Sequence, residues 1–264
     1  MAGGNRIFVD AITKYCARHG IACEVKSQGW LIVMKHNGVR RFALGYDVGL
    51  NTAISHRIAG DKAATSDILA MSGIACIPHT QFSNPTLIEY APQEGLQYAM
   101  HELLRAHPQG LVVKPNEGTS GRLVFKVASE AELDDAARKI FASHLSLAIS
   151  PWVDITEEVR VVLVDNTPLA VYAKARGADW RHNLELGARP VLLPPGAMRD
   201  ACVALAVAAA QAIGIRFASI DIVHVADEWK VLEINSGVMM EALGRHHPEL
   251  VHAAYTAALD RLFE

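Results

Sequence analysis

Cysteine is scarce in this chain and is never found in closely spaced pairs. Only four of the 264 residues are cysteines, at positions 16, 23, 76 and 202. No two of them have the C-x-x-C spacing that zinc sites and redox motifs use. The sequence therefore indicates neither a disulfide framework nor a structural zinc site.

An excess of charge of one sign is also lacking. Lysine and arginine number 25 against 28 aspartate and glutamate, which gives a formal net charge of −3. This balance lacks the basic footprint of a nucleic-acid-binding protein. The most apolar run, 201–215, is rich in alanine and shorter than a membrane span, and the N-terminus has no continuous apolar stretch of the signal-peptide type. We expect a cytoplasmic protein that binds neither nucleic acid nor a membrane.

What is present is a chain long enough for a sizeable core, with 51% hydrophobic residues. Apolar spacing predicts helices over 7–19, 50–72 (in two pieces), 94–107, 129–144, 198–213 and 248–262. It predicts strands over 22–25, 29–35, 39–45, 73–78, 111–114, 122–127, 145–153, 158–164, 169–173, 219–225 and 229–235. Neighbouring strands separated by turn signals, such as Asn37-Gly38, indicate hairpins and an α+β fold.

The stretch 219–235 is the clearest candidate for chemistry. With a three-residue loop over 226–228, Val225 faces Trp229, and Asp221 faces Glu233 four pairs further along the hairpin. Asn235 then shares the face of Glu233, because side chains alternate along a strand. The other face is apolar, with Ile220, Ile222, Leu232 and Ile234. Two opposed carboxylates repel each other, so this face predicts a positive group between them, and the oxygen donors suit magnesium. A solvated hairpin with incidental acids is the alternative.

A glycine-containing loop follows the strand 111–114. Gly118 and Gly121 flank Thr119 and Ser120, and the amides of such a loop can surround a phosphate, although a flexible hairpin tip shows similar glycines. Lys114 favours the phosphate interpretation, because it follows three apolar strand residues instead of lying on a solvated surface. A third segment, 174–183, concentrates cationic and amide side chains that could bind anions or form an ordinary solvated loop. These are Lys174, Arg176, Arg181 and Asn183.

Three segments together resemble one superfamily in order and spacing. K-P-N-E-G-T-S-G, R-G-A-D-W-R-H-N and D-I-V-H with V-L-E-I-N are similar to motifs of the ATP-grasp enzymes. The similarity is closest to the carboxylate–amine ligases, which include the ribosomal-protein glutamate ligase, cyanophycin synthetase and the bifunctional glutathione synthetases. N-T-A-I-S-H-R-I-A-G-D-K-A-A-T over 51–65 also resembles the start of the cyanophycin-synthetase unit. The resemblance covers about 51–243.

This resemblance implies an ATP-grasp fold, in which two α+β lobes with antiparallel sheets hold ATP between them. It divides the chain into a short N-terminal α+β unit (1–59), a central lobe with the glycine-rich loop (60–148) and a C-terminal lobe with the magnesium site (149–264). The implied ATP contacts are Lys62, Lys114, Gly118, Thr119, Ser120, Gly121, Trp152 and Glu158. The implied metal ligands, for Mg²⁺ or Mn²⁺, are Asp221, Glu233 and Asn235. The implied catalytic residues are Lys174, Arg176, Arg181 and Asn183.

The sequence departs from the family pattern in three places. Relatives carry a glutamate where the chain meets adenine, whereas 149–153 reads I-S-P-W-V. The proline that usually follows the E-x-N motif is replaced by Gly237 and Val238. The N-terminal unit is shorter than in most relatives, which suggests that a second subunit completes the site in a homodimer.

The reaction implied is ATP-dependent amide formation through an acyl-phosphate, with an amino acid or small peptide as substrate. Such a transfer needs positioning and charge stabilisation more than a protein nucleophile. Two other functions use the same residues, namely a small-molecule kinase and a non-catalytic nucleotide-binding protein. A requirement of ADP formation for both a carboxylate and an amine would separate the ligase from the other two.

Overall fold

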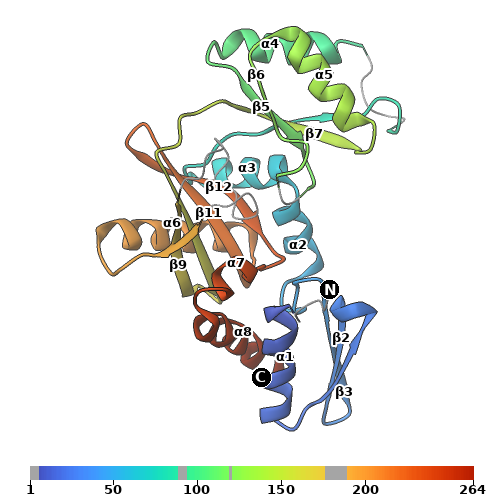
Figure 1. Cartoon of the computed structure of the whole chain (residues 1–264). Coiled ribbons are helices and arrows are strands. Elements are labelled where there is room, and N and C mark those ends of the chain that lie inside the picture. Colours follow the sequence, from blue (N-terminus) through green and yellow to red (C-terminus); the bar gives the residue numbers. More distant parts are fainter. Residues whose placement is uncertain (1–5, 89–93, 119–120, 176–188) are drawn as a thin grey trace.

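The computed structural model describes residues 6–88, 94–118, 121–175 and 189–264. These residues form three antiparallel sheets with helices packed against them, stacked as three tiers (Figure 1). The predicted α+β class is confirmed. None of the helices in these ranges has the length and apolar composition needed to cross a bilayer.

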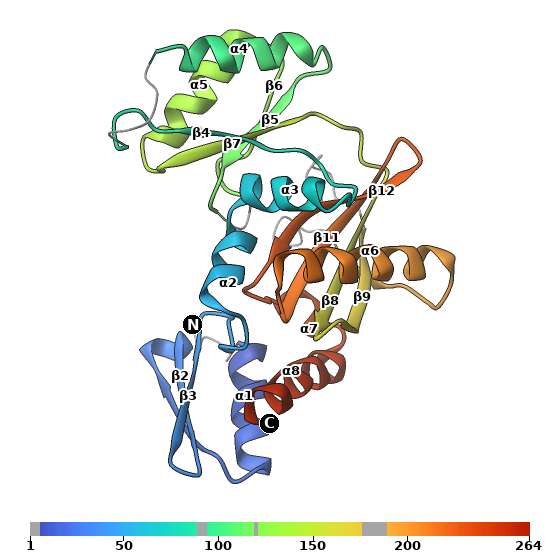
Figure 2. The same ribbon diagram turned by 180° about the vertical axis from the view of Figure 1, so that it is seen from behind.

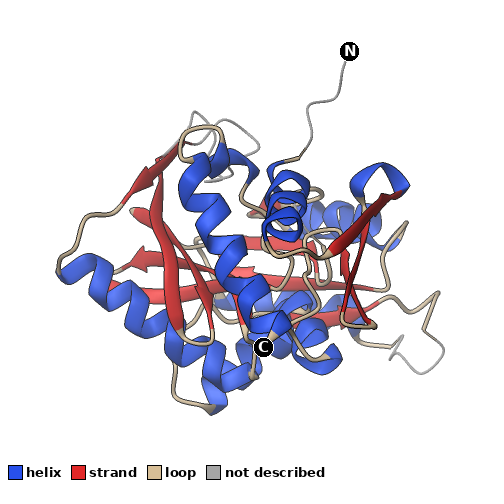
Figure 3. Cartoon of the chain, turned by 90° about the horizontal axis from the view of Figure 1, so that it is seen from below, coloured by secondary structure: helices blue, strands red, loops and turns tan. Residues whose placement is uncertain are grey.

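The lowest tier in Figure 1 is built by the N-terminal unit together with the C-terminal helix. It contains α1 (Ile7–Arg18), β1 (Ala22–Lys26), a short 3-10 helix η1 (Ser27–Gly29), β2 (Leu31–His36) and β3 (Val39–Leu44). The predicted hairpin across Asn37 and Gly38 is confirmed, since both residues have the positive φ that a tight hairpin turn requires. α8 (Pro248–Phe263) runs next to α1 (Figure 3). Phe8 meets Tyr255 edge-on, with 5.2 Å between the ring centroids.

Two consecutive helices, α2 (Ala53–Gly60) and α3 (Lys62–Met71), lead upward from this unit. Asp61 separates them, because its carboxylate accepts a hydrogen bond from the Ala64 amide at 2.8 Å and caps α3. The predicted division of this helical stretch is confirmed. The strand predicted over 73–78 is reduced to a single bridge between Cys76 and Val231, since Pro78 has no amide hydrogen with which to continue the pairing.

The central lobe forms the upper tier. Its sheet has the order β4-β7-β5-β6, from β4 (Thr80–Ser83), β5 (Leu111–Pro115), β6 (Phe125–Val127) and β7 (Ser146–Pro151). β6 is shorter than the predicted strand 122–127. Helices α4 (Leu96–Ala106) and α5 (Glu130–Phe141) cover this sheet and share its core with Leu111, Val113 and Leu147.

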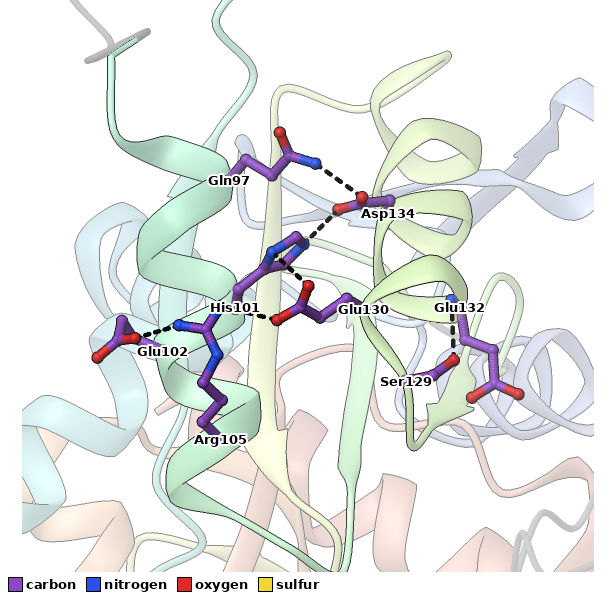
Figure 4. Close-up of polar contacts among 8 residues, drawn as sticks. All are labelled: Gln97, His101, Glu102, Arg105, Ser129, Glu130, Glu132 and Asp134. Carbon is purple, nitrogen blue, oxygen red and sulfur yellow. Dashed lines mark hydrogen bonds and ion pairs between the residues drawn. The ribbon is translucent and has the colours of Figure 1, made fainter.

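Polar side chains join α4 to α5 above that core (Figure 4). His101 on α4 contacts Asp134 on α5 at 2.9 Å, and Gln97 donates to the same carboxylate at 2.7 Å. At the start of α5 the Ser129 hydroxyl accepts a hydrogen bond from the Glu132 amide and so caps the helix. These hydrogen bonds hold α4 and α5 together.

The middle tier is a five-stranded sheet in the order β10-β9-β8-β11-β12. Its strands are β8 (Glu157–Val164), β9 (Thr167–Ala175), β10 (Arg189–Leu192), β11 (Phe217–Val225) and β12 (Glu228–Asn235). One face packs against α6 (Ala197–Ile213) with α2 and α3, and buries Val159, Val161 and Ile220 (Figure 2).

The opposite face of this sheet has two parts. At one end Val162, Val164 and Phe217 pack into the core of the lowest tier. At the other end alternate positions are polar, beginning with Glu158 and Arg160 on β8. This polar end forms one wall of a cleft.

Candidate active site

A cleft of about 1130 Å³ lies where the three tiers meet. Lys62 and Lys114 line it from α3 and the central lobe, Arg160 and Glu233 from the five-stranded sheet, and Tyr46 from the N-terminal unit. Most of the residues that the sequence singles out, although far apart along the chain, therefore border one space. Its volume lies slightly above the usual range for ligand pockets, about 300–1,000 Å³.

A row of four side chains crosses the sheet at the cleft. Tyr172 on β9 is paired with Arg160 on β8, Arg160 with Asp221 on β11, and Asp221 with Glu233 on β12. The four residues share a face because directly paired residues of antiparallel strands point to the same side. Asn235 and Ser219 form the adjoining pair in the same hairpin.

The β11–β12 turn differs from the prediction. The loop has two residues, Ala226 and Asp227, both with positive φ, and Val225 therefore pairs with Glu228 instead of Trp229. The predicted pairing of Asp221 with Glu233 is nevertheless confirmed, because a β-bulge at Leu232 adds one residue to β12 and restores the register.

The bulge also moves Leu232 to a different environment. The sequence places this side chain with Ile220, Ile222 and Ile234 in the core, and that placement is wrong for Leu232. It packs instead near Ile77 and borders the cleft. An inserted residue breaks the strict two-residue alternation that the prediction assumed.

Asp221 is buried and bound by two cations. Arg160 donates to both of its oxygens at 2.6 Å, and the Lys174 ammonium lies 2.9 Å from one of them. Burial alone raises the pKa of Asp221, but Arg160 and Lys174 outweigh burial and hold this pKa well below its usual range. The positive charge expected between the two acids is therefore supplied, on the side of Asp221, by the protein itself.

Lys174 joins this network to Glu158. Its ammonium donates a short hydrogen bond to the Glu158 carboxylate, and both side chains are buried. Burial raises the pKa of Glu158 to about 7, against the opposing effect of Lys174. This wall of the cleft thus carries two carboxyl groups, each paired with a cationic side chain.

Lys114 forms no such ion pair with any residue that the structure describes. It lies on β5, is 8% exposed, and burial lowers its pKa to about 8, with the nearby Glu233 acting in the opposite direction. Lys62 donates to the carbonyls of Asn116 at 3.2 Å and Gly118 at 3.0 Å, so its charge lies against the glycine-containing loop. Gly118 and Gly121 border the same cleft. Two lysines and the loop are arranged as an anion site requires.

The residues present fit a divalent cation at Glu233 and Asn235. Their side chains face the cleft, and apart from a long hydrogen bond of 3.4 Å between them their oxygens have no partner among the described residues. Histidine, cysteine, aspartate and glutamate alone form no group of three suited to a metal in the described ranges. A cation here would therefore need the Asn235 oxygen and oxygens of a ligand, as magnesium at a phosphate does.

Two buried hydroxyls at the same wall have unused hydrogen-bonding capacity. The Tyr172 hydroxyl lies near Arg160, and the Ser219 hydroxyl lies beside the hairpin acids, yet neither forms a hydrogen bond of normal geometry with a described residue. Both border the cleft. Buried polar groups usually have a partner, so these two hydroxyls are exceptions among the residues that form this wall.

Several predicted residues cannot be placed. Thr119, Ser120, Arg176, Arg181 and Asn183 lie outside the described residues. Trp152 and Glu158 both border the cleft, and the Lys126 ammonium lies 3.5 Å from the centre of the Trp152 ring. Of the predicted catalytic residues, the structure describes Lys174.

Reasoning from the sequence alone gave no role to three residues of this site. Arg160, Tyr172 and Asn116 all contribute, the last by accepting from the Ala63 amide at 3.1 Å and so fixing the loop against α3. The two-residue spacing of Glu158 with Arg160, and of Tyr172 with Lys174, is the signal that could have found the first two. Each pair lies on one face of a strand.

Solved structures share this fold. D-cycloserine synthetase DcsG aligns with a TM-score of 0.59 and 20% identity over 78% of this chain and 71% of that chain. D-alanine–D-alanine ligase from Bacillus anthracis, complexed with ATP, aligns with a TM-score of 0.58 and 19% identity over 80% and 70%. The structure of ATP-grasp ligase PsnB gives a TM-score of 0.54 at 16% identity, covering 80% and 64%. The three tiers and the cleft between them are thus an ATP-grasp fold.

Within that class the relationship is closer to one family. Residues 59–249 match the RimK-like ATP-grasp domain, and the chain belongs to this family. A probable alpha-L-glutamate ligase 2 of Shewanella amazonensis is 31% identical over 219 residues, which cover 78% of this chain and 64% of that protein. The tetrahydromethanopterin:alpha-L-glutamate ligase of Methanocaldococcus jannaschii is 26% identical over 132 residues, 47% and 44%. The chain thus spans less than two thirds of the length of these curated relatives.

Proposed function

We propose that this chain is an ATP-dependent carboxylate–amine ligase. A substrate carboxylate attacks the γ-phosphorus of ATP, and the bond to the β-phosphate oxygen breaks to release ADP and leave an acyl-phosphate. An amine then attacks the acyl carbon, inorganic phosphate leaves, and the amine loses a proton as the amide forms. One observation carries the proposal: in a RimK-like ATP-grasp chain, one cleft is bordered by Lys62, Lys114, the glycine-containing loop, Glu233 and Asn235.

The lysines and the loop are assigned to the phosphates of ATP. Lys62 and Lys114 lie where two positive charges can meet a polyphosphate, with Gly118, Thr119, Ser120 and Gly121 as the covering loop. Trp152 and Glu158 are assigned to the nucleoside end. The low pKa of Lys114, caused by its burial, means that a phosphate partner would favour its charged form.

Glu233 and Asn235 are assigned to Mg²⁺, or Mn²⁺, together with Asp221. The cation would neutralise charge on the transferring phosphoryl group. In the structure Asp221 is bound by Arg160 and Lys174, so its predicted share in the metal site requires that it keep these partners or exchange one of them. Lys174, Arg176, Arg181 and Asn183 keep their predicted role at the reacting groups.

The substrates are proposed to be amino acids or small peptides. The names of curated relatives, among them probable alpha-L-glutamate ligases, point to this class of compound. The proposal includes a homodimer, which the short N-terminal unit suggests, and a cytoplasmic location.

The test is release of ADP and phosphate from MgATP in the presence of amino acids, offered singly and in pairs. Release that depends on two amino acids together supports the ligase, and Glu233→Ala should abolish it. Glu228→Ala, at the exposed start of the same strand, is the matched control and should behave as the wild type does. Release with one hydroxylated compound alone would indicate a kinase. Binding of MgATP without turnover on any substrate would indicate a non-catalytic role.

A further inference from the structure

The N-terminal unit presents large apolar side chains to the cleft. Trp30, Phe42 and Leu44 are 54%, 54% and 57% exposed, and with Tyr46 they border the same space as the residues assigned to ATP. These four residues are called the aromatic wall below. Phe42 and Leu44 share one face of β3 because they are two residues apart. Large apolar side chains at the rim of a cleft mark a surface that gains free energy when a ligand covers it.

The aromatic wall is held in position from behind. The Arg6 guanidinium lies 4.9 Å from the centre of the Tyr46 ring and 5.4 Å from that of Trp30, and it donates to the carbonyls of Gly45 and Gly29. A Cβ at Gly45 would lie 3.2 Å from the Trp30 ring, so the indole would have to shift by a few tenths of an ångström, and the φ of 65° at this position also favours glycine. Contacts of this kind fix a binding surface before a ligand arrives.

Glu241, at the first position of α7 (Glu241–Gly244), ties the wall to the opposite side of the cleft. Its carboxylate accepts from the Tyr46 hydroxyl at 3.2 Å and from the Ile7 amide at 3.0 Å. α7 directly follows the segment that leaves the hairpin bearing Glu233 and Asn235. The wall and the proposed metal site are thereby held by neighbouring segments.

Arg245 follows α7 and also borders the cleft. Its side chain is exposed and forms no ion pair with any residue in the described ranges. An unpaired guanidinium at the edge of a ligand cleft suits a carboxylate, which it can bind through two parallel hydrogen bonds. Asp47 and Glu241 border the same end, so an acidic side chain placed there would meet two carboxylates.

We infer that this end of the cleft binds the amine substrate, an amino acid or peptide with a large apolar side chain. The side chain packs on the aromatic wall, and the free carboxylate pairs with Arg245. The inference rests on the proposed ligase function and adds to it the chemistry of one substrate. It distinguishes this chain from an enzyme whose amine substrate is glutamate, because the wall is apolar and the carboxylates of Asp47 and Glu241 border the same end of the cleft.

The experiment combines calorimetric binding with turnover. L-phenylalanine, L-leucine, L-glutamate and the dipeptide Phe-Ala are titrated into the full chain in the presence of MgADP, and each is also tested as the amine substrate in ADP release against pooled amino acids. We expect phenylalanine, leucine or Phe-Ala to bind, and glutamate not to bind. The Phe42→Ala/Leu44→Ala variant should weaken that binding at least about tenfold. Arg245→Gln should weaken it comparably, while phenylalaninamide, which lacks the carboxylate, should bind the wild type and Arg245→Gln alike.

Matched controls separate this effect from damage to the fold. Leu145→Ala removes an apolar side chain that is 61% exposed outside the cleft, and Arg138→Gln removes an arginine on the surface of α5. Both should leave amino-acid binding unchanged, and no variant should change ATP affinity more than about twofold.

Three results would overturn the inference. They are preferential binding of glutamate, unchanged binding in the Phe42/Leu44 variant, and ADP release with N-acetylphenylalanine as the carboxylate substrate. The proposed function would survive each of them, because amide formation would still be seen. Absence of ADP release with all pairs of amino acids would count against the ligase function itself. The calorimetric titrations would still decide whether the aromatic wall binds an apolar amino acid.

Discussion

Arg160 and Asp221 lie opposite each other on β8 and β11, and the guanidinium binds both carboxylate oxygens at 2.6 Å. Both side chains are largely removed from water, so loss of either one leaves an unpaired buried charge. We expect Arg160→Met and Asp221→Leu each to lower the free energy of unfolding by about 3 kcal/mol. In the double variant the free energy of unfolding, measured by urea unfolding, should fall by clearly less than the sum of the two single losses.

The exposed pair Arg138 and Asp135, 2.8 Å apart on α5, provides the comparison. The same double-variant cycle there should give a coupling energy below about 1 kcal/mol, since water screens the two charges. Equal coupling energies for the buried and the exposed pair would contradict the role given to burial.

Glu233 is expected to control the metal dependence of nucleotide binding. In Glu233→Gln, the gain in ATP affinity that Mg²⁺ provides should fall at least about tenfold, because a carboxylate ligand is replaced by a neutral amide. Affinity for ATP without Mg²⁺ should change little. Titrations with and without Mg²⁺ measure both quantities, and Glu228→Gln on the same strand serves as the control. An unchanged Mg²⁺ effect in Glu233→Gln would remove this residue from the metal site.

Lys114 should make the ligand-free protein less stable at neutral pH. Its folded pKa of about 8 is below the ordinary value of 10.5, so folding disfavours the charged form. The resulting loss of stability is complete below pH 8 and disappears as the pH rises to 10.5. At pH 7 the free energy of unfolding of Lys114→Met should therefore be about 2–3 kcal/mol higher than that of the wild type. This difference should shrink between about pH 8 and 10.

Urea unfolding at several pH values checks this relationship. Lys14→Met, at an exposed lysine of α1, should show no such pH-dependent difference. A Lys114→Met variant that is less stable than the wild type at pH 7 would show that the lysine has a stabilising partner.

The turn between β11 and β12 offers a stabilising substitution. Ala226 and Asp227 have φ of 49° and 63°, which asparagine and glycine adopt at lower cost. Ala226→Asn combined with Asp227→Gly should raise stability by about 1 kcal/mol without changing turnover, since neither residue borders the cleft. Thermal unfolding measures the gain, and the natural Asn37–Gly38 turn shows the same geometry in this chain.

These turns also show how far the sequence determines the fold. Asn37 and Gly38 are residue types that favour a two-residue turn, and the hairpin predicted there is confirmed. Ala226 and Asp227 carry no such signal, so a three-residue loop was expected in their place. The bulge at Leu232 cannot be read from alternation, because it is an exception to alternation.

The site was predictable where residue type alone is unusual. Lys114 stands out as a lysine in an apolar strand, and the structure shows it buried at the cleft. Arg160 does not stand out, because its significance depends on Asp221, sixty-one positions later. The aromatic wall depends on how the N-terminal unit folds back toward α7, a tertiary arrangement with no local signature in the sequence.

The two chain crossings into the central lobe have a mechanical consequence. On the way in, the backbone at Ala75 and Ile77 is hydrogen-bonded to Val231 on β12; on the way out, Thr156 is hydrogen-bonded to His224 on β11. Both connecting segments are therefore hydrogen-bonded to the hairpin that carries Asp221 and Glu233. A rotation of the central lobe would pivot on this hairpin, so that Lys114 swings toward or away from acids that stay in place.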